Sequence, residues 1–247
     1  MHRFFIPPEW IDQDNVFIKG RQAHQIVDVL RMREGDSITV LDNTGWEYEV
    51  ELERLTRGEV EGVVRGKSLA ATEPGTKLTL YQALLKADKF EFVLQKCTEL
   101  GVVGFVPLLC ERCVPLSGMS DRKLGRWQRI IAEAAEQSRR GKLPFLKPAL
   151  SFEQASQSAT GPSLLAWEGE RSSGLHETLR GLKAKGLSSL NLFIGPEGGF
   201  SPSELEFARG HGITPVTLGQ RVLRAETAGL VAASAILYEY GDLDLSD

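Results

Sequence analysis

The residues best suited to chemistry lie in a glycine-rich stretch, 194–204, with the sequence IGPEGGFSPSE. The apolar residues 190–194 predict a buried strand, and ligands of α/β proteins bind where such strands end. Ser201, Pro202 and Glu204 have the pattern of a capping box with proline at the first helical position, so a helix should follow at once. Three glycines allow the backbone to approach a ligand closely and exceed what a plain turn needs. The stretch is therefore interpreted as a binding loop.

This loop differs from the known nucleotide-binding fingerprints. It lacks the Lys-Ser/Thr pair of a phosphate-binding P-loop, and no G-x-G-x-x-G follows a first strand in the chain. The sequence therefore disfavours a kinase and a dehydrogenase of the usual Rossmann type.

A second loop, residues 218–229 with the sequence LGQRVLRAETAG, leads into an alanine-rich helix. Val222 and Leu223 are apolar residues in a polar loop, which suits the wall of a pocket. Arg224 and Glu226 flank the helix start. A favourable helix-dipole contact for Glu226 and a salt bridge between the two are the structural alternatives to a role in chemistry.

The N-terminal part of the chain has the pattern of short strands. Residues 37–42 and 46–53 alternate between apolar and polar, and 60–65 continue the pattern, which together predict a small β-barrel. Apolar residues recur at helical spacing between positions 23 and 30. The small residues and Pro-Gly of 68–75 mark the best linker.

Beyond the linker, strands alternate with helices, which predicts an α/β domain with a parallel sheet covered by helices on both faces. Residues 88–100 should form a helix that begins at an aspartate and ends at Gly101, and 121–140 a second one with an apolar stripe. The expected strands are 77–84, 104–108, 163–167, 190–194 and 215–218.

The balance of charge argues against a protein that coats nucleic acid nonspecifically, because the 247 residues carry a net charge of −4. Between positions 112 and 147, however, basic residues outnumber acidic ones. This segment is either a phosphate-contacting patch or a solvated helix face. The basic residues are Arg112, Arg122, Lys123, Arg126, Arg129, Arg139, Arg140, Lys142 and Lys147.

Three cysteines cannot all pair, and Cys110 and Cys113 form a lone C-x-x-C without the further ligands that structural zinc requires. No metal is expected. The N-terminus reaches proline before any apolar run, and the longest apolar stretch, 228–238, is too short to span a bilayer. We therefore expect a cytoplasmic protein that does not enter the membrane.

The two loops together, GPEGGFSxxE followed by LGxRVLRxETA, resemble the RsmE family, a group of SPOUT-class methyltransferases. That family methylates N3 of a uridine in small-subunit (16S) ribosomal RNA. One departure is Arg139, where the resemblance leads us to expect glycine. Further matching motifs are Arg3-Phe4-Phe5, His24 with Val29-Leu30-Arg31-Met32, Gln95-Lys96-x-Thr98-Glu99-Leu100-Gly101-Val102, Glu111-Arg112-Cys113 and Glu133-Ala-Ala-Glu136-Gln137-Ser138-x-Arg140.

The resemblance implies a PUA-like RNA-binding barrel over residues 1–72 and a trefoil-knotted SPOUT methyltransferase domain over 73–247, working as a homodimer. S-adenosyl-L-methionine would bind in a pocket made by three loops, held mostly by backbone groups. The implied cofactor-binding residues are Ala166, Trp167, Glu168, Ile194, Gly195, Pro196, Glu197, Gly198, Gly199, Leu218, Gly219, Val222, Leu223, Arg224 and Thr227.

Methylation of N3 requires a base, or a positive charge that stabilises the developing uracil anion. Arg224, with Arg140 or Arg112, is the candidate for that charge, while Glu226 or Glu197 would orient the cofactor or accept the proton. RNA contacts are expected from Arg3, Arg31, Arg122, Arg126 and Arg139. The partner would be small-subunit ribosomal RNA or the assembled small ribosomal subunit. Two alternatives remain: a methyltransferase of the same class with another RNA target, and a noncatalytic RNA-binding protein of ribosome assembly.

Overall fold

The computed structural model describes residues 1–86, 88–113 and 120–244 of the protein. The chain divides into two compact units. The first contains Met1–Glu73 together with Ala135–Leu143, and the second contains Pro74–Ala134 together with Pro144–Asp247. The chain therefore leaves the first unit after Glu73 and returns to it for one short segment.

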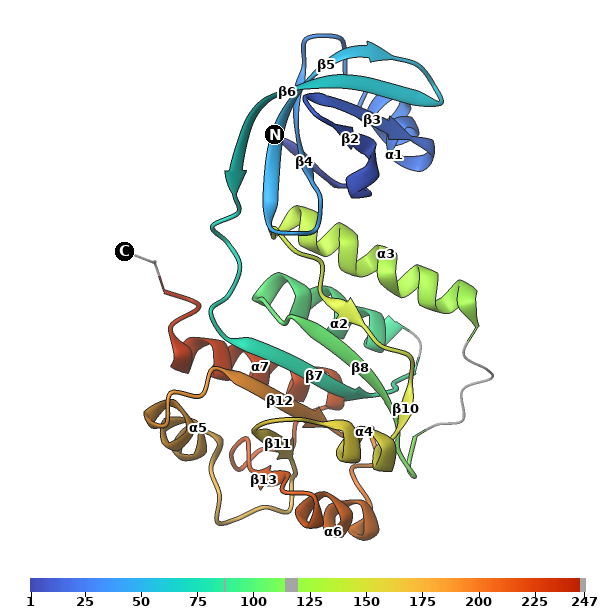
Figure 1. Ribbon diagram of the computed structural model, residues 1–247. Helices are drawn as coiled ribbons and strands as arrows, with labels where there is room; N and C mark the ends of the chain where they lie inside the picture. The colour runs from blue at the N-terminus through green and yellow to red at the C-terminus, as the bar shows by residue number, and fades with distance from the viewer. Residues whose placement is uncertain (87, 114–119, 245–247) are drawn as a thin grey trace. The chain divides into compact units, whose positions relative to one another are not determined.

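The first unit is built on a six-stranded mixed sheet with the order β1-β4-β5-β6-β3-β2 (Figure 1). The pair β1–β4 is parallel and the other neighbours are antiparallel. Alternate residues of these strands are buried in one apolar cluster, so the predicted strand pattern of this region is confirmed. The strands are β1 (His2–Phe5), β2 (Ile11–Asp12), β3 (Asn15–Lys19), β4 (Ser37–Leu41), β5 (Trp46–Leu55) and β6 (Glu59–Leu69).

A helical segment interrupts these strands where it was predicted. It consists of α1 (Gly20–His24) and one π-helical turn, η2 (Gln25–Val29). Ala23 and Ile26 are fully buried in the cluster that the strands form. A 3₁₀ turn, η1 (Pro8–Trp10), lies between β1 and β2.

The returning segment packs on β1 and β4 of the unit. Ala135 and Leu143 join Phe5 and Leu41 in a separate apolar cluster. The backbone N–H of Phe5 donates to Glu136 Oε1 at 3.1 Å. Contacts over such a sequence separation leave no trace in local periodicity, and the sequence did not predict them.

Helix α3 (Asp121–Gln137) ends three residues before the predicted boundary at position 140. The cause is Arg139, whose φ of 63° is left-handed and cannot continue a helix. The Arg140 N–H bonds to the Ala135 carbonyl and the Arg139 N–H to the Glu136 carbonyl. These two bonds define a Schellman motif with an arginine at the position that favours glycine.

Arg139→Gly should therefore raise the free energy of unfolding by about 0.5–1 kcal/mol, because it removes left-handed strain at a modest entropic cost. Chemical denaturation followed by circular dichroism measures this. Arg129→Gly, in the exposed interior of the same helix, is the control and should destabilise by about 1 kcal/mol. An Arg139→Gly variant less stable than the parent protein would contradict the strain argument.

The second unit contains an all-parallel sheet with the order β10-β8-β7-β12-β11-β13, and β9 pairs with β8 (Figure 1). All five strands predicted in this half are present, with ends shifted by at most two residues. The strands are β7 (Lys77–Ala83), β8 (Gly104–Leu109), β9 (Phe145–Leu146), β10 (Leu150–Ser151), β11 (Ser163–Ala166), β12 (Ser189–Ile194) and β13 (Thr214–Val216).

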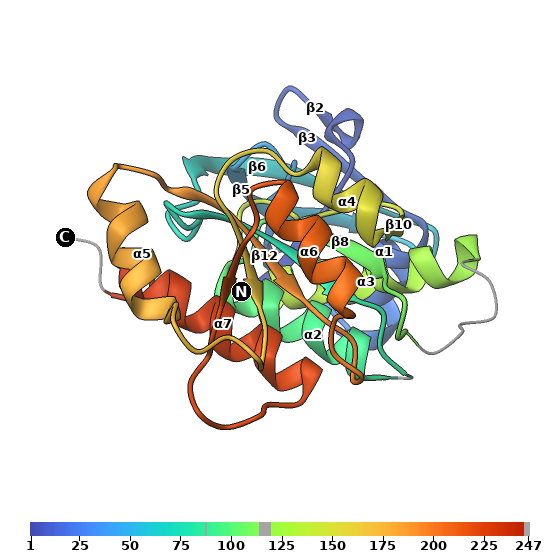
Figure 2. The same ribbon diagram turned by 90° about the horizontal axis from the view of Figure 1, so that it is seen from below.

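Helices cover both faces of this sheet, as predicted. Strand β12 shows the division, because Leu190, Leu192 and Ile194 belong to one core cluster and Phe193 to the other. The first cluster includes α2 (Asp88–Leu100), α3, α5 (Leu175–Ala184) and α7 (Ala225–Tyr240), and the second α4 (Phe152–Ser158) and α6 (Pro202–Gly210). Figure 2 shows α6 and α7 on opposite sides of β12.

The residues that begin and end these helices agree with the sequence prediction. Helix α2 spans the predicted residues, and Gly101 follows it with a left-handed φ of 115°. Ser201 and Glu204 form both bonds of the capping box at the start of α6, with Pro202 at its first position. In the part of the chain that the structure describes, no helix combines the length and apolarity that crossing a membrane would require.

Candidate functional site

The candidate site lies where three neighbouring strands end. Ala166, the last residue of β11, is the register partner of Ile194 on β12 and of Val216 on β13. Because the strands are parallel, the three loops that follow them start at the same edge of the sheet. The loops line one cavity of about 470 Å³, together with residues of α2 and α7.

Most residues predicted to bind a cofactor line this cavity. They are Ala166, Trp167, Glu168, Ile194, Gly195, Pro196, Glu197, Gly198, Gly199, Leu218, Gly219, Val222, Leu223 and Arg224. Thr227 is the exception, because it lies outside the cavity wall. Their role toward a cofactor remains a prediction. The sequence missed six other lining residues: Lys89, Phe200, Thr217, Arg221, Ala225 and Ala228.

The loop after β12 uses its glycines for close packing. Gly199 has a φ of 68°, and its N–H bonds to the Pro196 carbonyl at 2.9 Å. A Cβ atom on Gly195 would lie 3.2 Å from the ring of Phe200, which is tighter than an ordinary contact. Larger residues at these two positions would strain the loop, so its backbone stays close to the cavity.

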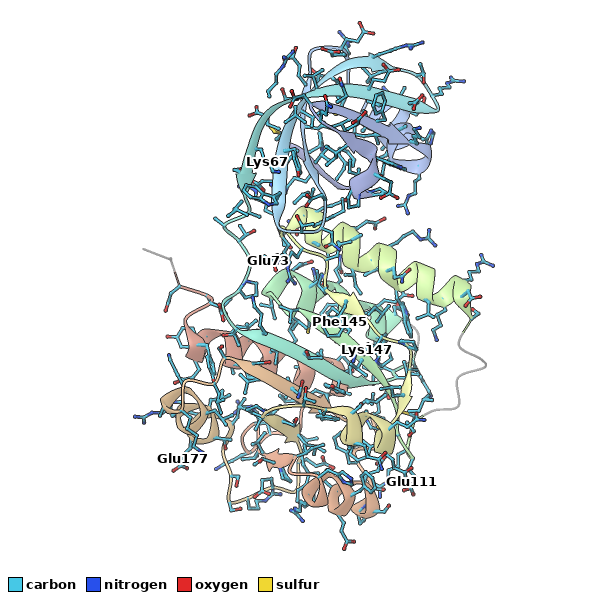
Figure 3. The ribbon with its side chains drawn as sticks, in the orientation of Figure 1. Lys67, Glu73, Glu111, Phe145, Lys147 and Glu177 are labelled. Carbon is cyan, nitrogen blue, oxygen red and sulfur yellow. The ribbon has the colours of Figure 1, made fainter. Side chains whose placement is uncertain are left out.

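The Glu-Arg-Cys stretch after β8 supports this loop from outside. The Arg112 guanidinium donates to the carbonyls of Gly198 at 3.0 Å and Phe200 at 3.4 Å. Glu111, labelled in Figure 3, donates its backbone N–H to Glu204 Oε1 at 2.9 Å. Arg112 therefore holds the loop in shape, and its proposed action on a substrate stays a prediction.

The loop before α7 brings arginines and apolar side chains to the cavity. Val222 is 82% exposed although it is apolar, and Gly219 has a left-handed φ of 108°. Arg224 occupies the N-cap of α7 but offers no side-chain cap. Among the described residues, no ion pair involves Arg221 or Arg224. Both guanidinium groups are exposed and can serve an anionic ligand.

The loop after β11 contributes an aromatic wall. The Trp167 N–H bonds to the Val216 carbonyl at 3.0 Å, which fixes the start of the loop. The guanidinium of Arg209 lies 5.7 Å from the centre of the indole ring. Gly169 is required here, since a Cβ atom on it would come within 2.3 Å of that ring.

Helix α2 adds a lysine that the sequence did not point to. Lys89 lies in its first turn, and its ammonium group is 3.4 Å from Glu197 Oε1 and 3.4 Å from Glu226 Oε1. Glu226 itself is not part of the cavity wall and is connected to it through Lys89. Lys89 reaches the site because β7, which precedes α2, neighbours β12 in the sheet. Strand order cannot be read from local patterns, so no sequence signal indicated this residue.

Arg140 belongs to the first unit, where its side chain is 3% exposed. Its Nη2 and Nε atoms bond to the two carboxylate oxygens of Glu73 at 2.9 and 3.2 Å. Burial alone would raise the pKa of Glu73, but the bonds and charge of Arg140 and the N–H groups of Gly141 and Lys142 outweigh it and lower that pKa. The described contacts thus give Arg140 a structural partner, and its catalytic role remains a prediction.

The residues predicted to contact RNA differ in their surroundings. Arg31, Arg122 and Arg139 are exposed, with Arg31 in a left-handed conformation at a φ of 55°. Arg3 is mostly buried and pairs with Glu47 at 2.7 Å. Arg126 is exposed and pairs with Glu91 at 2.6 Å. RNA would have to displace these two carboxylates to use either guanidinium.

The cysteines are free thiols with different environments. Hydrogen bonding from the Cys110 side chain and backbone outweighs burial and lowers the pKa of the Cys113 thiol to about 7. The same contact with Cys113, together with burial, raises the pKa of Cys110, and burial raises that of Cys97 to about 12. Within residues 1–86, 88–113 and 120–244, no three histidine, cysteine or acidic side chains gather as metal ligands would.

Comparisons with known proteins cover both units. The profile of the family described as an RNA methyltransferase domain matches residues 72–237, and that of an RNA methyltransferase PUA domain matches residues 18–65. The chain is 38% identical to the ribosomal RNA small subunit methyltransferase E of Synechocystis sp. over 238 residues, which cover 95% of this chain and 77% of that protein. It is 35% identical to the protein of the same name from Bacillus subtilis, with 97% of each chain covered.

A solved structure has the same fold over nearly the whole chain. It is the crystal structure of a ribosomal RNA small subunit methyltransferase E from Neisseria gonorrhoeae bound to S-adenosyl methionine. The TM-score is 0.87 at 30% sequence identity, with 96% of this chain and 97% of that chain covered. The predicted fold class, an α/β methyltransferase domain of SPOUT type preceded by a PUA-like domain, agrees with these similarities.

Proposed function

Because the chain belongs to the family of RNA methyltransferases that includes the ribosomal RNA small subunit methyltransferase E proteins, we propose that it methylates N3 of a uridine in small-subunit ribosomal RNA. S-adenosyl-L-methionine is the proposed methyl donor. The observation that carries the proposal is the cavity that three loops line together at the ends of β11, β12 and β13.

The residues around the cavity fit this cofactor. A volume of about 470 Å³ lies in the range of pockets that hold small organic ligands. The glycine loop presents backbone groups that suit the hydrogen-bonding edges of adenine and ribose, while Val222, Leu223 and Trp167 present apolar surface. When bound, S-adenosyl-L-methionine supplies a methyl group on a positively charged sulfur.

The protein's own residues then have to position a uracil and manage a proton. The N3 atom of uridine is protonated at neutral pH, so the reaction requires a proton acceptor and a charge that stabilises the uracil anion. Arg224 lines the cavity with an exposed guanidinium and is the proposed source of that charge. Glu197, also in the wall, is the proposed acceptor or cofactor contact, and Glu226 pairs with the same lysine, Lys89.

RNA binding is proposed for the first unit and for the basic residues 112–147. Exposed arginines at positions 31, 122, 126 and 139 support it, because phosphate contacts need accessible cations. We propose that residues 1–72 form the RNA-binding domain and residues 73–247 the methyltransferase domain. The proposed substrate is the assembled small ribosomal subunit, and the proposed location is the cytoplasm. The trefoil knot remains a prediction.

A homodimer is also proposed. Val231 and Tyr238 lie seven residues apart on α7 and are exposed apolar side chains on one helical face. A second copy of the chain would cover this face. Sedimentation equilibrium measures the oligomeric state, and a monomer at micromolar concentration would contradict the proposal.

The deciding experiment incubates small ribosomal subunits that lack the modification with the protein and labelled S-adenosyl-L-methionine. We expect label in the ribosomal RNA and one new stop of reverse transcription, because a methyl on N3 blocks the pairing edge of uracil. Label on another RNA would shift the substrate, and cofactor uptake without label on any RNA would favour a noncatalytic role in assembly. Free ribosomal RNA, tested in parallel, shows whether the assembled particle is required.

A further inference from the structure

Lys89 and its two carboxylate partners form a cluster of opposite charges at the cavity. Lys89 and Glu197 both line the cavity wall, on α2 and on the loop after β12 respectively. Glu226, in the first turn of α7, contacts Lys89 but does not line the cavity. The cluster thus joins three elements that are distant in sequence.

The contacts within this cluster leave hydrogen-bonding capacity unused. Both Lys89 contacts measure 3.4 Å, longer than the 2.7–2.9 Å typical of strong charge-assisted bonds. An ammonium group has three donors, so Lys89 can accept a further anionic partner. The Glu226 side chain is only 14% exposed, and among the described residues its buried Oε2 atom has no hydrogen-bond partner. Such a carboxylate depends on the nearby lysine for compensation.

We propose that Lys89 binds the carboxylate at the amino-acid end of a nucleoside sulfonium donor, that Glu197 binds the α-ammonium group of the same end, and that Glu226 positions Lys89. An α-amino acid carries one positive and one negative charge, and the cluster offers one partner for each. This inference rests on the proposed function, because it assigns a part of the same cofactor cavity.

The rest of the cavity wall supports this division of the ligand. The loops after β12 and β13 present glycines and apolar side chains, which suit an uncharged nucleoside. Helix α7 begins at the cavity with Ala225, and its N-cap residue provides no side-chain bond to the free N–H groups of the first turn. These N–H groups add positive potential on the side where the carboxylate is proposed to bind.

The test measures binding by calorimetry with three probes. S-adenosyl-L-methionine has the complete amino-acid end, its decarboxylated form lacks only the carboxylate, and 5′-methylthioadenosine lacks the whole end. Lys89→Ala should lower the affinity for S-adenosyl-L-methionine at least about tenfold, because a bond between two charged groups is lost. It should change the other two by less than about threefold. Lys89→Arg should recover part of the loss.

Lys96→Ala is the matched control. Lys96 lies on the same helix, its side chain is 36% exposed against 37% for Lys89, and it pairs with Glu99 at 2.8 Å. It does not line the cavity, so all three affinities should stay unchanged. Thermal unfolding of each variant confirms that the fold is intact, and Lys89→Met, which retains the apolar stem, serves if Lys89→Ala is unstable.

Each outcome separates the inference from the proposed function. If Lys89→Ala lowers the affinity for all three probes equally, the lysine shapes the loops and does not bind the carboxylate, which overturns the inference. Unchanged affinity for S-adenosyl-L-methionine would overturn it as well. Failure of the unsubstituted protein to bind any of the three probes would instead remove the proposed function.

Discussion

Arg224→Ala is expected to lower the rate of methyl transfer by about 10²–10³-fold, the usual effect of removing one group that stabilises a developing anion. The uracil anion spreads its charge over two oxygens, and a guanidinium can donate to an oxyanion with two parallel N–H groups. The side chain is exposed at the N-cap of α7 and makes no side-chain cap bond. Its loss should therefore change the free energy of unfolding by less than about 0.5 kcal/mol.

Single-turnover transfer from saturating labelled S-adenosyl-L-methionine to small ribosomal subunits measures this rate apart from cofactor binding. Arg224→Lys retains the charge but not the planar guanidinium, so its rate should lie between those of the parent protein and of Arg224→Ala. Arg180→Ala, an exposed arginine on α5 that does not line the cavity, is the control and should retain the parent rate. Normal turnover in a folded Arg224→Ala variant with unchanged cofactor affinity would exclude the proposed role.

Features that depend on adjacent residues were predictable from the sequence. The bounds of α2 follow from an aspartate at its start and a glycine after its end, and the start of α6 follows from the Ser201–Glu204 capping box. The apolar run 190–194 predicted β12, the strand that leads into the glycine loop. Each of these signals acts within one or two turns of chain, so no knowledge of the fold was needed.

Features that depend on strand order were not predictable. Lys89 on α2 reaches the cavity because β7, the strand before this helix, neighbours β12, although Lys89 is 105 positions from Ile194, the last residue of β12. The return of residues 135–143 to the first unit depends on Phe5 and Leu41, which are more than 90 residues away. No local pattern carries such information. The trefoil knot that the resemblance implies would be of the same kind, since periodicity says nothing about how a chain threads.

Arg139 shows how a departure from a pattern can be explained once the backbone is known. The expected glycine would occupy the left-handed position of a Schellman motif, and the arginine adopts that conformation at a steric cost. The motif also directs the next residue, Arg140, toward Glu73. The position is therefore constrained by backbone geometry in addition to any contact with RNA.

Arg140→Ala should lower the free energy of unfolding by about 3 kcal/mol, near the lower end of the range for broken buried ion pairs. The lower end applies because Glu73 keeps 18% of its side chain exposed. After the substitution, the N–H groups of Gly141 and Lys142 are the compensation that the described residues leave to the carboxylate. Arg140→Lys should lower the free energy of unfolding by less, because a lysine retains the charge. It should still be less stable than the parent protein, because a lysine cannot make the two parallel bonds. Urea denaturation followed by circular dichroism measures both.

The pH dependence of stability gives an independent measure of this pair. The pKa of Glu73 is lowered in the folded protein from its ordinary value of 4.5. Its contribution is therefore complete above about pH 4.5 and is lost as the pH falls through the lower, folded-state value. The parent protein should lose stability over this acidic range, and Arg140→Ala should show a shallower loss because part of the contribution is already absent.

Glu73→Gln separates a structural role of Arg140 from a role in catalysis. This variant breaks the same ion pair but leaves the arginine in place, so a purely structural role predicts similar turnover for Glu73→Gln and Arg140→Ala. Both are assayed below their unfolding temperatures, where circular dichroism confirms the fold. If turnover falls by more than about 100-fold in Arg140→Ala alone, the guanidinium acts on RNA or on the uracil, as the sequence resemblance implied. Equal and small losses would assign Arg140 to the architecture of the first unit and leave Arg224 as the cation at the reacting base.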